Sequence, residues 1–373
     1  MNRKRLWIGE APKDPSLDDI IWQRPAQGPS SLRTKLDPEL KMIGAVPPLN
    51  RDFLWLSTAV FLADRQTRRP KGWRRTLQVT VPVSAMEDWS NVASDLEATL
   101  GFLTSDTWDV DFEATSLAES KAKPVKRPEV DSVSLFSGGA DSMCGVLQLL
   151  SQGSRVGLVS HWDWSGHAGT QRQLLRELRG LFGDRVVSWQ VQLGRGSCQI
   201  NGRSFPDEAT RRSRSLLFLS LGLAVASQGT QSQLWIPENG FTSLNPPLAP
   251  ERRGALSTRT THPKFLAGVK KLLKGVGAHA DFENPYEQLT KGEMFIEVSG
   301  LIGPDQASDL LSMTHSCAHV RLAGSVGYPP GTHCGICFGC LVRRAAFLSS
   351  GLQDQTTYLV TELSKRTLAE FLK

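Results

Sequence analysis

The chain has 373 residues, of which 40% are hydrophobic and 21% charged, and its formal net charge is +6. The length allows two domains, and the ordinary composition excludes a disordered or collagen-like protein. The mild positive charge permits an anionic partner such as ATP, RNA or an acidic protein patch without requiring one. No apolar run reaches the roughly 20 residues that span a bilayer. The basic start lacks the apolar region of a signal peptide, and six cysteines are too few for a disulfide scaffold. We therefore expect a cytoplasmic protein.

The first part of the chain, residues 1–115, is predicted to be a small accessory domain of the α+β class. Apolar residues recur there with helical spacing in some segments and alternate as in strands in others. The expected elements are a strand at 5–8, a helix at 52–64, a strand at 76–81, a helix at 86–103 and a strand at 108–112. Residues 116–128 are polar, charged and contain prolines, which is typical of a linker. Residues 129–373 then form the second predicted domain.

A basic turn lies between the expected helix at 52–64 and the strand that follows it. Its basic residues are Arg65, Arg68, Arg69, Lys71, Arg74 and Arg75. Two interpretations of this turn are open: it is a solvated loop, or it is a contact surface for nucleic acid or an acidic partner. Trp73 beside the arginines slightly favours the partner surface.

Residues 133–142 read Val-Ser-Leu-Phe-Ser-Gly-Gly-Ala-Asp-Ser, a pattern that predicts a buried strand, a glycine turn and a helix start. Such a turn offers backbone N–H groups and the positive end of a helix to a phosphate, and glycines allow close approach. The predicted ATP-binding residues are Leu135, Phe136, Ser137, Gly138, Gly139, Ala140, Asp141 and Ser142. Asp141 suits a Mg²⁺ contact or a helix-start anchor. The alternative is a capped turn without a ligand. No lysine follows the glycines, so the loop is not a Walker loop.

Strands and helices alternate after this motif, which predicts an α/β fold with a doubly wound parallel sheet. Strands are expected at 133–136, 155–160, 185–191, 234–236 and 279–283, and helices at 141–151, 169–182, 211–228 and 263–275. Ligands bind beyond the carboxyl ends of such strands. This rule places His161, Asp163, Glu238 and Asn239 at the same edge as the glycine turn. The long loop at 237–262 either closes over a substrate, contacts a partner or is disordered.

Cys317, Cys334, Cys337 and Cys340 form a pattern of one cysteine followed by Cys-x-x-Cys-x-x-Cys. Four thiolates satisfy a tetrahedral Zn²⁺ and leave no open position, so the predicted site is structural and pins the segment 313–340. An iron–sulfur cluster or reduced, unligated thiols are the alternatives. Three histidines lie close enough in sequence to replace a cysteine ligand: His315, His319 and His333.

Ser-Gly-Gly-x-Asp-Ser after a strand resembles the PP-loop of the N-type ATP pyrophosphatases, which split ATP between the α and β phosphates and form an adenylate. Together with the four cysteines, it resembles the 7-cyano-7-deazaguanine synthase family, QueC, over roughly residues 130–350. Residues 214–219 resemble the family's Arg-Asn-x-x-Phe-Leu helix start, and residues 290–293 resemble its Lys-x-Glu segment. The resemblance implies an adenine nucleotide α-hydrolase-like fold and the cofactors ATP, Mg²⁺ and Zn²⁺. It also implies conversion of 7-carboxy-7-deazaguanine through an amide to the nitrile preQ0. The implied catalytic residues are Asp141, Ser137 and Lys291, and the implied substrate contacts are Arg214, Glu238, Asn239 and Lys291. For Arg214 and Lys291, a surface ion pair is the alternative.

The chain departs from the compact synthase at three places. Ser215 stands where the family has asparagine, residues 239–263 replace a Tyr-Pro-Asp-type loop, and residues 1–115 have no counterpart. This layout resembles the QueC-like proteins of anti-phage islands, such as QatC and those of type IV CBASS operons. It implies a protein partner from the same operon and transfer of the activated deazaguanine carboxylate to a protein amine. A PP-loop enzyme that modifies tRNA or DNA and a non-catalytic ATP-sensing scaffold are the other hypotheses.

Overall fold

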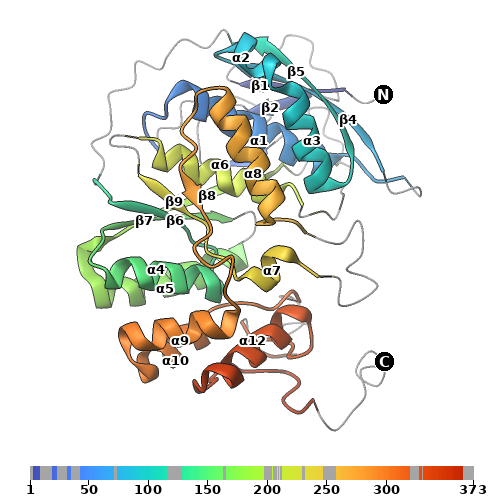
Figure 1. Ribbon diagram of the computed structural model, residues 1–373. Coiled ribbons are helices and arrows are strands. Elements are labelled where there is room, and N and C mark those ends of the chain that lie inside the picture. Colours follow the sequence, from blue (N-terminus) through green and yellow to red (C-terminus); the bar gives the residue numbers. More distant parts are fainter. Residues whose placement is uncertain are drawn as a thin grey trace.

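The computed structural model describes most of the chain. The described residues are 3–8, 19–22, 32–34, 43–70, 74–115, 128–162, 165–196, 204, 208, 210, 212–228, 232–246, 258–319, 327–329 and 331–363. They form two sheets with helices between and below them (Figure 1). No helix in these ranges combines the length and the apolar character that a membrane crossing needs.

The larger sheet has the strand order β10-β9-β6-β7-β8-β3. Its strands are β3 (Leu32–Thr34), β6 (Ser132–Leu135), β7 (Val156–Trp162), β8 (Val186–Arg195), β9 (Gln233–Trp235) and β10 (Phe282–Glu283). All of its neighbouring strands pair in parallel except β3 and β8, which are antiparallel. The sheet confirms the predicted α/β fold with a parallel sheet. The order changes direction at β6, where the chain first adds β7 and β8 on one side and later β9 and β10 on the other. A ligand site is expected at such a switch point.

Helices cover both faces of the larger sheet. On the lower face in Figure 1 lie α4 (Ala140–Ser151) and α5 (Ser165–Phe182), with α9 (Lys291–Ile302), α10 (Pro304–Ser312) and α12 (Phe338–Ser350) beneath them. On the upper face lies α6 (Arg214–Ala226), which is apolar along nearly its whole length. Gly222 of α6 lies so near the sheet that a Cβ would come within 2.7 Å of the Leu135 side chain. Because both faces of the sheet are covered, β6 and β7 are buried almost without interruption instead of alternating between buried and exposed residues.

The smaller sheet comes from the N-terminal part and has the order β2-β1-β4-β5, all parallel. Its strands are β1 (Arg3–Ile8), β2 (Asp19–Trp22), β4 (Thr76–Val83) and β5 (Thr107–Ala114), and its helices are α1 (Pro48–Gln66), α2 (Met86–Asn91) and α3 (Ala93–Thr104). The helix expected over 86–103 is interrupted at Val92, whose φ is −108° and ψ is 8°. Before the break, the Trp89 indole is fully buried and donates a hydrogen bond to Asp52 at 3.2 Å.

Helix α1 lies between the two sheets and packs on α6. It is buried on nearly every side, because the smaller sheet covers one flank and α6 covers the other. One continuous hydrophobic cluster therefore joins residues of both parts of the chain, from Leu6 to Phe282. A second cluster lies below the larger sheet, between α4, α5, α9 and α12. Helix α8 (Pro263–Gly275) packs against α3 of the N-terminal part.

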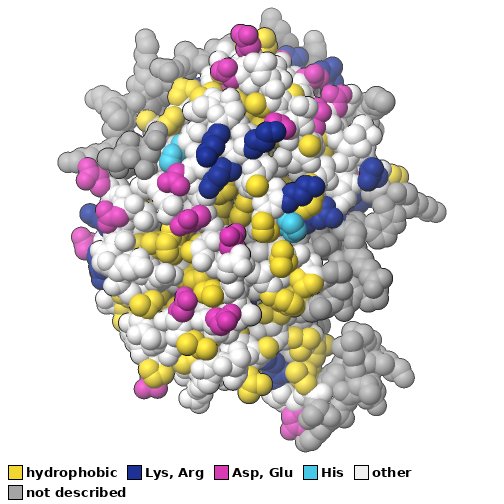
Figure 2. All heavy atoms as spheres, in the orientation of Figure 1, with side chains coloured by type: hydrophobic (Ala, Val, Ile, Leu, Met, Phe, Trp, Pro, Cys, Tyr) yellow, Lys and Arg dark blue, Asp and Glu magenta, His cyan; other side chains and the backbone are white. Residues whose placement is uncertain are grey.

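Two arginines of the basic turn, Arg69 and Arg75, are paired inside the fold, whereas Arg68 and Arg74 are exposed. Arg75 is 4% exposed and pairs with Asp64 and with Asp106 at 2.6 Å, and Arg69 pairs with Asp106 at 2.8 Å. Lys71 and Trp73 lie outside the described residues. Figure 2 shows Lys and Arg side chains gathered over the upper half of this face, where α8 lies in Figure 1. The lysines of α8 are Lys264, Lys270, Lys271 and Lys274.

Candidate active site and metal centre

The predicted phosphate loop joins β6 to α4 and is shaped by its own side chains. Gly138 has a φ of +85°, in the left-handed region that favours glycine. The Gly139 N–H donates to Ser137 Oγ at 3.2 Å, and Ser142 Oγ donates to the Gly139 carbonyl at 2.9 Å. Ser137 Oγ and Ser142 Oγ are themselves 3.2 Å apart. The loop is therefore already folded around the start of a 12-residue helix, with its first N–H groups available to an anion.

Asp141 lies at the centre of the polar residues at this edge of the sheet. Lys291 Nζ is 2.7 Å from Asp141 Oδ1, and Asn239 Nδ2 donates to Asp141 Oδ2 at 2.8 Å. Burial by itself raises the pKa of Asp141, but the charge of Lys291 and the hydrogen bonds to the carboxylate outweigh it and bring the pKa below its ordinary value. Asp141 is therefore a buried carboxylate that keeps its charge at neutral pH.

Glu238 is the second carboxyl group of the cluster and behaves in the opposite way. Its removal from water and the adjacent charge of Asp141, to which its side chain is hydrogen-bonded, raise its pKa well above the ordinary value. Of these two neighbouring carboxyl groups with opposite shifts, Glu238 is the one that takes up a proton first as the pH falls. The cluster of Asp141, Glu238, Asn239 and Lys291 thus brings together four of the residues that the sequence singled out.

The topology explains how these residues meet. Asp141 follows β6, whereas Glu238 and Asn239 follow β9, which pairs with β6, so both segments emerge at the same edge. Asn239 also caps the short helix α7 (Gly240–Leu244), because its side chain accepts the Thr242 N–H at 2.9 Å. Lys291 is the first residue of α9, which begins with a capping box between Thr290 and Glu293.

Asn284 is a site residue that the sequence reasoning missed. Its side chain accepts the Glu238 N–H at 3.1 Å and donates to the Glu238 carbonyl at 2.7 Å. It also donates to Ser243 Oγ at 3.2 Å and is 8% exposed. Asn284 therefore fixes the backbone of Glu238 against the end of β10. A lone asparagine after a short strand carries no distinctive sequence signal.

Two further contacts support the phosphate loop from outside. Gln171 of α5 donates from Nε2 to the Ser137 carbonyl at 3.2 Å. The His315 N–H donates to the Gly138 carbonyl at 2.9 Å. The loop is thereby connected to the cysteine segment, which begins two residues after His315. Neither contact was predicted, and the second is a backbone contact that no side-chain pattern reveals.

Three other predicted positions are not part of this described cluster. Arg214 is the first residue of α6 and is half-buried. His161 is 1% exposed, and its Nε2 is 2.6 Å from the Leu193 carbonyl, so its ring bridges β7 and β8 within the core. Asp163 lies outside the described residues. The polar cluster around Asp141 therefore forms without His161.

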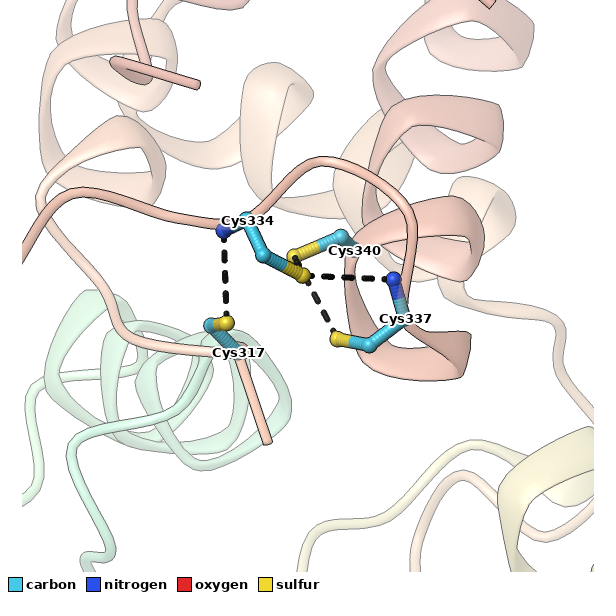
Figure 3. Close-up of side chains that lie close together, drawn as sticks. All are labelled: Cys317, Cys334, Cys337 and Cys340. Carbon is cyan, nitrogen blue, oxygen red and sulfur yellow. Dashed lines mark hydrogen bonds between the residues drawn. The ribbon is translucent and has the colours of Figure 1, made fainter. Parts of the chain in front are cut away.

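The four cysteines converge as the spacing predicts (Figure 3). Their sulfur atoms all lie within 4.8 Å of one another, with Cys337 and Cys340 at 3.5 Å and Cys334 and Cys340 at 3.8 Å. A tetrahedral ion with metal–sulfur bonds of about 2.3 Å requires sulfur separations of about 3.8 Å. The arrangement is thus able to bind zinc.

Hydrogen bonds reach the sulfurs of the cluster and favour the thiolate form at one of them. Cys317 Sγ accepts the Cys334 N–H at 3.4 Å and the His319 N–H at 3.3 Å. Hydrogen bonds from the Cys317 and Cys340 thiols lower the pKa of the Cys337 thiol, and the hydrogen bonds within the cluster raise the pKa of Cys317 to about 11 and raise that of Cys340 as well. The histidines serve as supports: His315 Nε2 is 3.1 Å from the Cys317 carbonyl, and His333 Nε2 accepts the Ser316 N–H at 3.1 Å.

Comparison with known proteins gives a consistent set of relatives. The 7-cyano-7-deazaguanine synthase 1 of Sphingopyxis alaskensis is 28% identical over 246 residues, which cover 60% of this chain and 96% of that protein. The synthase of Novosphingobium aromaticivorans is 28% identical over 255 residues, covering 63% and 98%. The synthase of Syntrophobacter fumaroxidans is 25% identical over 252 residues, covering 61% and 96%. No family model matches the chain. With its parallel sheet and four-cysteine centre, the chain is similar to the 7-cyano-7-deazaguanine synthases, the QueC family, over about 60% of its length.

Proposed function

We propose that the protein is an ATP-dependent, AMP-forming enzyme that activates the carboxylate of 7-carboxy-7-deazaguanine, as a ligase of the 7-cyano-7-deazaguanine synthase type. The observation that carries this proposal is the meeting of the phosphate loop with the Asp141–Lys291 ion pair and with Glu238, whose pKa is raised, at the switch point of the sheet. The relatives are synthases of 7-cyano-7-deazaguanine, which indicates a deazaguanine substrate.

Adenylation solves a chemical difficulty. A carboxylate is a poor acyl donor because its leaving group would be an oxide ion. In the proposed first step, a carboxylate oxygen attacks the α-phosphorus of ATP and the bond to pyrophosphate breaks. In the second step, an amine nitrogen attacks the acyl carbon, loses a proton and displaces AMP. The amide then takes a second equivalent of ATP when the product is the nitrile, because its oxygen must leave as AMP.

The residues of the site have distinct parts in this scheme. The first N–H groups of α4 and the ammonium of Lys291 stabilise the charge on the departing pyrophosphate. Asp141 keeps its charge and offers the carboxylate oxygens that Mg²⁺ prefers, so it would hold the ion. When bound, this ion supplies positive charge to the phosphates. The cysteine centre has all four positions filled by thiolates, so zinc there has a structural role.

The fate of the adenylate is the finer part of the proposal. Ammonia as acceptor gives the amide and then preQ0, and a protein amine as acceptor gives a deazaguanine conjugate. The long N-terminal part, packed on α6, favours an acceptor protein from the same operon, and we place the activity in anti-phage defence. The alternative of a nucleic-acid-modifying enzyme has less support, because Arg69 and Arg75 of the basic turn are paired inside the fold.

The test is pyrophosphate release by the purified full chain with ATP, Mg²⁺ and 7-carboxy-7-deazaguanine, alone and with the proteins encoded beside it. We expect release that requires the acid and is abolished in Asp141→Asn. Mass spectrometry of the mixture then identifies preQ0, the amide or a modified protein. Pyrophosphate release that is independent of the acid, or absent in every mixture, would contradict the proposal.

A further inference from the structure

One aromatic ring of the N-terminal part is surrounded by groups from the segment that ends the long loop. Phe102 of α3 has the Arg259 guanidinium carbon 4.5 Å and the Lys264 ammonium 4.9 Å from its ring centroid. The His262 ring lies 5.1 Å away at an interplanar angle of 66°. Arg259 also donates a hydrogen bond to the Phe102 carbonyl. Two cations and an edge-on ring around one phenyl ring make this a specific attachment point.

The attached segment is bound in turn to the loop that leaves the active site. Thr261 Oγ1 is 3.1 Å from Ser243 Oγ, and Asn245 Nδ2 donates to the Thr258 carbonyl at 2.5 Å. These two contacts hold residues 258–262 against α7, which begins directly after Asn239.

The last step reaches the carboxyl cluster itself. Ser243 Oγ accepts a hydrogen bond from Asn284, and Asn284 holds both backbone groups of Glu238. The connection therefore runs from Phe102 to Arg259 and His262, along the backbone to Thr261, and through the hydrogen bonds of Ser243 and Asn284 to Glu238. The residues that form this connection are buried: Thr261, Ser243 and Asn284 are 7%, 2% and 8% exposed.

We infer that Phe102 is a positioning residue for the acid-binding side of the active site, and that the N-terminal part thereby completes the enzyme. The inference rests on the proposed function for its kinetic consequence only. It explains why this chain is longer than its relatives: they are covered almost completely, yet they match only about 60% of this chain. The phosphate loop is held by Gln171 and His315 instead, so Phe102 acts on the acid side and leaves ATP binding unchanged.

The test compares three variants of the full chain. Phe102→Leu keeps an apolar side chain and removes the ring face, whereas Phe102→Tyr keeps the face. Phe112→Leu is the matched control, because Phe112 lies on β5 of the same part and its ring neighbours Trp89 at 6.0 Å, away from the loop. The first measurement is hydrogen–deuterium exchange of residues 240–246 and 258–262 without any substrate. The second is the KM for 7-carboxy-7-deazaguanine and for ATP in pyrophosphate release.

We expect Phe102→Leu to exchange both segments about fivefold faster, the factor that a cation–π contact of ordinary strength provides, while Phe102→Tyr and Phe112→Leu match the native chain. The KM for the acid rises by a similar factor and the KM for ATP stays constant. Equal exchange in Phe102→Leu and the native chain overturns the inference, as does equal loss in the leucine and tyrosine variants. Faster exchange throughout the chain also overturns it, because Phe102 is then an ordinary core residue. If the native chain releases no pyrophosphate, the proposed function fails, and the exchange data still decide the role of Phe102.

Discussion

Replacing Lys291 by methionine tests the charge balance of the active site. Methionine keeps most of the apolar stem of lysine and removes only the ammonium. Asp141 is then left as a buried carboxylate whose remaining close partners, Asn239 and the Glu238 carboxyl group, carry no positive charge. Removing one partner of a buried ion pair costs about 3–5 kcal/mol. The two side chains retain 11% and 7% exposure, so we expect the lower limit, a loss of about 3 kcal/mol in the free energy of unfolding at pH 7.

The pH dependence has a defined sign. The pKa of Asp141 is lowered in the folded state, so its stabilisation is present above its ordinary pKa of 3.8 and is lost as the pH falls through the lowered value. In Lys291→Met the ammonium that lowers the pKa of Asp141 is gone. Burial, which raises this pKa, then dominates, so Asp141 takes up a proton at a higher pH. The difference in the free energy of unfolding between the native chain and Lys291→Met is therefore smaller at pH 4 than at pH 7.

Urea denaturation at both pH values measures this difference. The double variant Lys291→Met with Asp141→Asn removes the stranded charge, and we expect it to recover at least half of the loss. Lys271→Met is the matched control, because it breaks an equally short pair with Asp95, at 2.8 Å, on the surface. That pair is worth less than about 1 kcal/mol. A loss in Lys291→Met as small as in the control, or equal at both pH values, refutes the reasoning.

Three further changes test the rest of the site. Glu238→Gln mimics the protonated acid. Because the pKa of Glu238 is raised above its ordinary value of 4.5, the native chain must take up a proton to fold above that pH and loses stability as the pH rises. The variant, which does not titrate, should therefore gain on the native chain in denaturation curves as the pH rises above 4.5. Gly138→Ala and Gly153→Ala each place a residue with a Cβ at a positive φ, which costs about 1–2 kcal/mol of stability. Only Gly138→Ala should also weaken ATP binding, measured by equilibrium dialysis. Equal ATP affinities of the two variants would count against a role of the Gly138 loop in ATP binding. Cys337→Ser should lower the zinc content found by metal analysis and the melting temperature, whereas Cys144→Ser, in the core behind the loop, should keep its metal. An unchanged metal content in Cys337→Ser would remove that cysteine from the ligand set.

The sequence predicted best what is encoded locally or by a general rule. The strand, glycine turn and helix around Gly138 are a short-range pattern, and α8 begins and ends at the predicted residues. The meeting of Asp141 and Asn239, 98 positions apart, follows from the rule that ligand sites lie beyond the carboxyl ends of strands. The spacing of the cysteines likewise predicted their convergence.

The sequence could not reveal which distant groups become partners. Lys291 was expected to contact a phosphate or a substrate carboxylate, and in the structure it pairs with Asp141 of the protein. Arg75 looked like a surface charge, because its buried partners Asp64 and Asp106 come from other elements. Asn284 and the His315 N–H support the site through the backbone, where residue type carries little information.

Strand β3 has a consequence for the order in which the chain can fold. Thr34 Oγ1 donates to the Gln192 carbonyl, 158 positions further along the chain, and β3 covers the outer edge of β8. During synthesis β3 is therefore made long before β8, and it cannot pair with β8 until that strand has been made as well. Until both are present, an exposed strand edge invites pairing with other chains. A variant that lacks the residues up to and including β3 would leave the outer edge of β8 permanently exposed, so we expect it to aggregate. The N-terminal part thus also protects the larger sheet against self-association.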